Sequence, residues 1–236
     1  MNTLKSIIAP LLIAVGLLSL GLCIKAGIDN FSHRDRVVTV RGLAEKQVEA
    51  NEVIWPVVTK LIGDDLQALY TTIQQNNSAI VNFLKSNGIT DKEITINPPS
   101  VEDRHANAYD NSALSTERYR VTNVIVVTSS QVEKVNSLIA KQTELMRQGI
   151  AVVAGDYQYQ TQYNYTALNS IKPEMIAEAT KAAREAGDRF AADSHSKLGK
   201  IKTATQGQFS IEDRDQYTPF IKTVRVVNSI TYYLEN

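Results

Sequence analysis

Residues that could carry out catalysis or bind a metal are scattered through this sequence. The three histidines, His33, His105 and His195, have no partner at the spacing of a zinc site. The sequence contains no glycine-rich phosphate loop, nucleophile elbow or kinase signature. It therefore predicts no catalytic residue, no cofactor and no metal site, and it makes a hydrolase the least favoured functional class.

Two acidic pairs raise the question of calcium binding. Glu102-Asp103 and Glu212-Asp213 each lie at the tip of a predicted hairpin and are followed by an arginine. A calcium loop alternates its oxygen ligands along the chain, and neither pair does so. Solvated hairpin tips are therefore favoured over calcium sites.

A run of alternating aromatic and amide side chains offers the most distinctive surface chemistry. Tyrosines alternate with amides at Tyr157, Gln158, Tyr159, Gln160, Gln162, Tyr163, Asn164 and Tyr165. One interpretation is an aromatic platform for sugar rings or a peptide. Another, favoured by the strand preference of tyrosine, is that the tyrosines cover the core while the amides face solvent. A third is an amide-rich face between subunits. The second predicts that replacing Tyr159 by alanine weakens folding more than ligand binding.

Composition excludes some partners. The 236 residues hold 25 basic and 25 acidic side chains, so no overall positive field attracts nucleic acid. The single cysteine, Cys23, permits no internal disulfide and so neither requires nor excludes an oxidising compartment. We predict no nucleic-acid partner.

The N-terminal segment is long and apolar enough to anchor the chain in a membrane. Residues 6–24 carry no charge and lie between Lys5 and Lys25. The segment lacks small residues at plausible cleavage points, which favours an uncleaved anchor over a signal peptide. The flanking charges do not decide its orientation. The anchor residues are Ile7, Leu11, Leu12, Ile13, Val15, Leu17, Leu18, Leu20, Leu22 and Ile24.

The rest of the chain alternates between strand and helix patterns. Strands are predicted at 37–41, 47–60, 93–101, 118–128, 150–164, 201–211 and 221–234. One helix is predicted from Asp64 and Asp65 to Gly88, a second over 131–148, and a third with Pro173 in its first turn. Gly42 is expected to turn the chain between the first two strands. We expect an anchor or signal peptide over 1–25, a linker over 26–36 and one domain over 37–236.

Two strands are predicted to lie at sheet edges. Pro56 removes a ladder amide, which restricts its strand to an edge or a bulge. The last strand has no internal proline or glycine, and it offers Ser229 and Tyr233 as a complementary edge. The candidate interaction residues are Pro56, Ser229 and Tyr233 at these two edges and Tyr157, Tyr159 and Tyr163 in the tyrosine run. Pairing between different edges of two copies predicts a homo-oligomer, with a ring favoured over a filament.

An internal echo indicates a duplicated unit. After the first helix come Gly88, Val-Glu-Asp-Arg at 101–104 and a strand at 120–125. After the third come Gly199, Ile-Glu-Asp-Arg at 211–214 and a strand at 225–230. The shared order favours a repeated helix–strand–hairpin–strand unit over chance. The predicted fold class is α+β, an antiparallel sheet with helices on one face, preceded by one transmembrane helix.

From Val38 onwards the sequence resembles the SIMPL-domain family. The resemblance is carried by Val-Thr-Val-Arg-Gly at 38–42, by Leu-Lys-Ser-Asn-Gly-Ile at 84–89, and by an alanine-rich helix at 177–197. The chain departs from the family pattern at 49–52, where Glu-Ala-Asn-Glu replaces a Pro-Asp opening. The resemblance implies an α+β envelope protein linked to stress defence and homo-oligomers, and it supplies no catalytic residues.

Two functions are expected. The first is a non-enzymatic, self-assembling interaction protein, anchored in the inner membrane with its domain in the periplasm, with a link to envelope or oxidative stress. The alternative is a periplasmic binding module for a glycan, peptide or small ligand through the tyrosine run.

Overall fold

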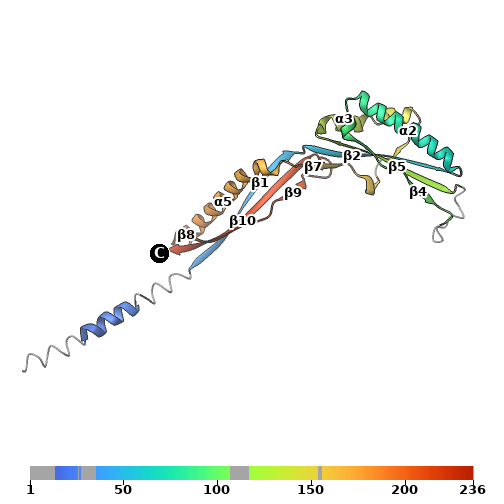
Figure 1. Cartoon of the computed structure of the whole chain (residues 1–236). Coiled ribbons are helices and arrows are strands. Elements are labelled where there is room, and N and C mark those ends of the chain that lie inside the picture. The colour runs from blue at the N-terminus through green and yellow to red at the C-terminus, as the bar shows by residue number, and fades with distance from the viewer. Residues whose placement is uncertain (1–13, 26, 28–35, 107–116, 154–155, 236) are drawn as a thin grey trace, which may run out of the picture. The chain divides into compact units, whose positions relative to one another are not determined.

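The structure is a computed structural model of the chain, and it describes residues 14–25, 27, 36–106, 117–153 and 156–235. These residues form antiparallel sheets and several helices (Figure 1), which confirms the predicted α+β class. They divide into two compact units, each considered by itself below. Unit 1 comprises Met1–Lys46, Asn169–Ser210 and Val224–Asn236, and unit 2 comprises Gln47–Leu168 and Ile211–Thr223.

Unit 2 is built on a six-stranded sheet with the order β3-β5-β2-β6, in which β4 also pairs with β5 and β7 with β2. Its strands are β2(Glu52–Gly63), β3(Ile94–Ile96), β4(Ser100–Asp103), β5(Tyr119–Ser129), β6(Val152–Val153) and β7(Gln162–Asn164). The long pair β2 and β5 keeps one register from Val53–Ser129 to Gly63–Tyr119. Because side chains alternate along a strand, this register gives the sheet two distinct faces.

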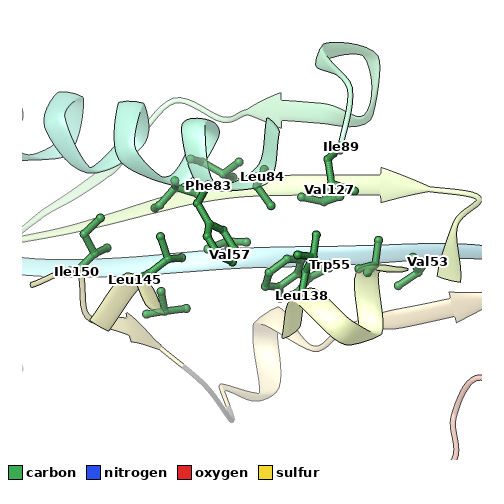
Figure 2. Close-up of a cluster of buried hydrophobic side chains, with 14 residues drawn as sticks. Val53, Trp55, Val57, Phe83, Leu84, Ile89, Val127, Leu138, Leu145 and Ile150 are labelled. Atoms are coloured by element: carbon green, nitrogen blue, oxygen red, sulfur yellow. The ribbon is translucent and has the colours of Figure 1, made fainter. Parts of the chain in front are cut away.

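One face of this sheet is covered by helices. They are α2(Leu66–Ser86), α3(Val132–Lys141) and α4(Thr143–Arg147). Val53, Trp55 and Val57 of β2 are almost fully buried beneath them. Figure 2 shows side chains from strands and helices converging in one core, among them Trp55, Val57, Phe83, Leu84, Leu138 and Leu145. Burying such side chains is the main source of stability for this unit.

The predicted ends of α2 are confirmed. Asp65 caps the helix by accepting hydrogen bonds from the amides of Gln67 and Ala68, at 2.9 and 3.1 Å. Gly88 follows the helix with a φ of +84°, which a glycine adopts without strain. The second predicted helix is divided at Gln142 into α3 and α4.

The second sheet has the order β1-β10-β8, with β9 beside β10. The elements that lie mainly in unit 1 are β1(Val37–Glu49), α5(Leu168–Asp193), β8(Lys197–Gln206) and β10(Ile221–Glu235), whereas β9(Ser210–Asp213) belongs to unit 2 after Ser210. The predicted turn at Gly42 is wrong, because β1 runs through it. Gly42 instead allows close packing: an added Cβ would lie 1.9 Å from the carbonyl oxygen of Ala179 in α5.

The predicted tyrosine strand is also wrong. The described residues between 150 and 164 form β6, a 3₁₀ turn η3(Tyr157–Tyr159) and β7 in place of one continuous strand. Tyr157 is 89% exposed, so it does not cover the core. Asp156 starts the turn by accepting a hydrogen bond from the amide of Gln158 at 3.1 Å, a local bond that competes with an extended strand.

Neither predicted edge strand is an edge. β2 pairs with β5 on one side and with β6 and β7 on the other, and β10 lies between β1 and β8. Pro56 sits between the pairing of Glu52–Ile54 with β7 and that of Val58 and Thr59 with β6. A proline without an amide donor is tolerated at such an interruption. Ser229 pairs with Thr205 of β8 and is therefore inside the sheet.

Residues 14–25 form a helix, and its leucine, isoleucine and valine side chains are exposed. Among the residues that the structure describes, no helix is both long and apolar enough to cross a membrane. The anchor residues Ile7, Leu11, Leu12 and Ile13 lie outside the described residues.

Candidate functional site

The face of the unit 2 sheet opposite the helices carries a groove of about 330 Å³, which we call the helix-free groove. Its floor is formed by Ile54 and Pro56 of β2 and by Thr122, Val124 and Val126 of β5. One wall contains Asn97, Pro98 and Ser100, between β3 and the start of β4. The other contains Gln158, Tyr159, Gln160 and Gln162, from η3 to β7.

Backbone and ion-pair contacts hold both walls in place. The amide of Asn97 donates to the carbonyl of Val124 at 3.1 Å, which ties the first wall to the floor. In the second wall, Lys60 Nζ lies 2.6 Å from Asp156 Oδ2. The hydrogen bond from Lys60 lowers the pKa of Asp156 below its usual value. The Asp156 carboxylate also caps η3, which contains Tyr159. The ion pair with Lys60 of β2 therefore helps to position Tyr159.

The groove combines an apolar floor with uncharged polar walls. None of its lining side chains carries a charge. In the described part of the chain, the side-chain amides of Asn97, Gln158, Gln160 and Gln162 form no hydrogen bonds with protein groups, so they remain able to bind a ligand. A smaller hollow of about 230 Å³ shares Pro56, Tyr159 and Gln160 with the groove. Tyr159 therefore borders both hollows.

The family comparison agrees with this architecture. A model of the SIMPL family, described as a protein of unknown function (DUF541), matches residues 38–228. The chain belongs to the SIMPL family. This confirms the resemblance seen in the sequence, and the floor and walls of the helix-free groove lie within the matched residues. No curated protein matches this SIMPL chain.

The SIMPL domain brings two of the predicted interaction residues together and separates the others. Pro56 and Tyr159 meet in the helix-free groove, whereas Tyr157 does not line it. Ser229 and Tyr233 belong to unit 1. There Tyr233 lies beneath Lys202, whose Nζ is 5.5 Å from the ring centroid.

Tyr163 has a structural role in this SIMPL domain. Its hydroxyl donates to Asn136 Oδ1 at 2.5 Å, and its ring meets Phe220 edge to face at 6.1 Å. Burial raises the pKa of Tyr163. Of the predicted tyrosines, it is Tyr163 that packs against the unit 2 core around Val53.

Three of the four side chains in the acidic pairs of the SIMPL chain form ion pairs. Arg118 contacts Asp103 at 2.7 Å, and Arg120 contacts Glu102 at 3.1 Å. Asp213 pairs with Lys222. No cluster of three or more His, Cys, Asp or Glu side chains that could hold a metal ion occurs within the described ranges.

Sequence reasoning missed the first wall of the groove. Asn97, Pro98 and Ser100 fall in a region that was predicted as one strand over 93–101. The Pro98-Pro99 pair was the available signal, because consecutive prolines interrupt strand pairing and favour a connection.

Proposed function

We propose that this SIMPL-family chain is a membrane-anchored, extracytoplasmic binding module that is not an enzyme. The observation that supports the proposal is the helix-free groove, where Tyr159 and side-chain amides that bond no described protein group surround an apolar floor. A charge-free lining suits an uncharged ligand, because burying an unpaired charge there would be costly. The proposed ligand is an uncharged glycan of the cell envelope.

A glycan suits the groove better than a peptide does. Sugar rings present apolar C–H faces to a flat floor and hydroxyl groups to surrounding amides, which matches Ile54, Pro56 and the glutamines. An extended peptide needs a strand edge to satisfy its own amides. The floor strands β2 and β5 are both paired on each side, so the groove offers a face and not an edge.

The test compares two neighbouring tyrosines. Tyr159→Ala is expected to weaken binding of uncharged envelope glycan fragments about tenfold or more, because stacking area is lost. Tyr157→Ala is the matched control, since Tyr157 is 89% exposed and outside the groove. Isothermal calorimetry on the full chain measures both. Equal loss in the two variants, or binding of extended peptides alone, would contradict the glycan proposal.

Self-assembly is a second proposed function, and a specific feature of unit 1 supports it. In the described part of its sheet, β1 and β8 occupy the outer positions, and the side chains of β8 are largely exposed from Lys200 to Gln206. The proposed contact between copies is therefore made by these outer strands, and no longer by the strands that contain Pro56 and Ser229. Lys197, Lys200 and Lys202 make β8 basic, so it would favour an acidic neighbour such as the edge carrying Glu45.

A proline scan across residues 202–205 tests this assembly. Successive amides of an edge strand point alternately inward and outward. Prolines at outward positions are expected to dissociate the oligomer without unfolding unit 1, and inward ones to unfold it. Light scattering of the detergent-extracted chain measures its mass. A single-subunit mass in the parent protein would exclude self-assembly.

Duplication, anchoring and a role in envelope stress complete the proposal. The order β2, α2, β3, β4, β5 corresponds to β1, α5, β8, β9, β10, and both sheets place the last strand beside the first. Asn123 and Asn228 hold matching positions in the echo, and each is buried and bonded to its unit's helix.

The helix at 14–25, with its exposed apolar side chains, supports anchoring in the inner membrane with the domain in the periplasm.

A further inference from the structure

A second hollow in unit 2 lies on the helix-covered face and differs in chemistry from the helix-free groove. It has a volume of about 460 Å³, within the roughly 300–1,000 Å³ typical of ligand pockets. Its apolar lining comes from α2, β5 and the segment at β4: Leu66, Tyr70, Ile73, Pro99, Val101 and Val121. We call this hollow the α2 pocket.

The α2 pocket is held open by directional contacts on both sides. At the start of α2, Asp65 caps the helix and Asp64 Oδ1 accepts the amide of Arg118 at 2.8 Å. Further along α2, Asn77 Oδ1 accepts a hydrogen bond from Asn123 Nδ2 at 2.6 Å. Moving α2 toward the sheet would break the Asp64–Arg118 and Asn77–Asn123 hydrogen bonds, so these two bonds keep the pocket preformed.

Several apolar side chains of the α2 pocket are exposed. Leu66 is 42% exposed, Tyr70 55% and Val101 49%. Side chains of this size usually gain stability by leaving water, and an exposed concave apolar patch is typical of a binding site. An apolar ligand would cover all three at once.

The surrounding charges select against an anionic ligand. Asp64 and Asp65 directly precede Leu66, and neither is ion-paired within the described residues. Arg118 and Arg120 are already paired with Asp103 and Glu102. A ligand carboxylate would therefore meet the negative charge of Asp64 and Asp65 at the start of α2. Gln67, the polar residue in the lining, suits an uncharged hydroxyl or carbonyl group.

We propose that the α2 pocket binds a small, uncharged, apolar molecule with one polar end. The molecule inserts its hydrocarbon part between Tyr70 and Val101 and places its polar end near Gln67. This site is independent of the helix-free groove, because the two lie on opposite faces of the sheet and share no lining residue. The proposal therefore stands or falls separately from glycan binding.

Photolabelling of the full chain in lipid nanodiscs tests the proposal. The probe is a medium-chain alkyl diazirine ending in an alcohol, with matched probes ending in a carboxylate or an amine. Mass spectrometry is expected to find saturable labelling by the alcohol probe at residues 66–73, competed by unlabelled octan-1-ol. The carboxylate probe is expected to label these residues least.

Two variants and one matched control identify the site. Val101→Lys is expected to reduce labelling of residues 66–73 about tenfold, and Tyr70→Gln to reduce labelling at Pro99 and Val121 similarly. Ile211→Lys is the control, because Ile211 is the counterpart of Val101 in the echo, is 37% exposed and does not line the pocket. Circular dichroism identifies any variant that fails to fold.

Three results would overturn the proposal. The first is labelling confined to residues 1–25, which would indicate probe dissolved in lipid. The second is an equal loss in folded Ile211→Lys and folded Val101→Lys. The third is stronger labelling by the carboxylate probe than by the alcohol.

Discussion

At the scale of single residues, Gly42 sets how closely α5 can approach β1. An added Cβ would lie 1.9 Å from the carbonyl oxygen of Ala179 and 2.3 Å from the amide nitrogen of Ala183. Both are backbone atoms, so neither can move aside without shifting the helix. The small side chains that the sequence places along α5 serve this contact.

We predict that Gly42→Ala destabilises unit 1 by about 3 kcal/mol, because the helix must shift away from the strand. Gly63→Ala is the control, since its nearest contact would be Leu69 at 3.4 Å, an ordinary van der Waals distance. Urea unfolding of the two variants and the parent measures the difference. An unchanged unfolding midpoint in Gly42→Ala would show that the close packing is not required.

Single residues also mark the limit of what the sequence could predict. Pro56 was predicted to lie at a sheet edge, and the favoured interpretation placed Tyr159 over the core; the structure instead brings both residues to the helix-free groove. Tyr159 is placed by the turn after Asp156, a local bond that overrides the strand pattern. Tyr159→Ala is accordingly expected to cost less stability than a buried aromatic truncation, since Tyr159 is only partly buried.

At the scale of elements, an asparagine pair joins α2 to β5. Asn77 is 8% exposed and Asn123 is 1% exposed, and they interrupt an otherwise apolar stripe. Asn123 Oδ1 has no partner in the described part of unit 2, and Thr59 lies opposite Asn123 on β2. A buried amide of this kind fixes the position of a helix along a sheet, because sliding would leave it without its partner.

We predict that Asn77→Leu destabilises unit 2 by about 1–3 kcal/mol, because Asn123 is left buried without its hydrogen bond. Adding Asn123→Val is expected to recover part of the loss, since both polar groups are then removed. Gln75→Leu on the exposed side of the same helix serves as the control. Thermal unfolding of the parent, of Asn77→Leu, of Asn123→Val and of the double variant gives the coupling free energy, and additive effects would contradict it.

Elements with strong local signals were predicted well, and those fixed by distant contacts were not. α2 has a capping aspartate and a terminal glycine, and β5 is rich in valine, so both were predicted within a few residues. β1 was divided at Gly42, because the sequence does not reveal that a helix more than a hundred residues away packs there. The groove was missed as a whole for the same reason.

At the scale of the whole molecule, the proposed membrane attachment depends on the N-terminal segment. We predict that residues 7–24 stay on the mature protein and retain it in the membrane fraction, because the run is uncharged and has no good cleavage point. Fractionation and mass spectrometry of the mature N-terminus measure this. A soluble protein beginning between Ala26 and Ser32 would contradict the prediction.

The position of β10 has a consequence for the order in which the chain can fold. In the described sheet, β1 and β8 each pair with β10, and Thr39 bonds Thr231 across 192 residues of sequence. Translation therefore produces β1 long before its partner β10, and the continuous segment 47–168 can collapse in the meantime. A chain interrupted before β10 would leave two strands with open amides, and such a fragment is an expected target of chaperones and proteases.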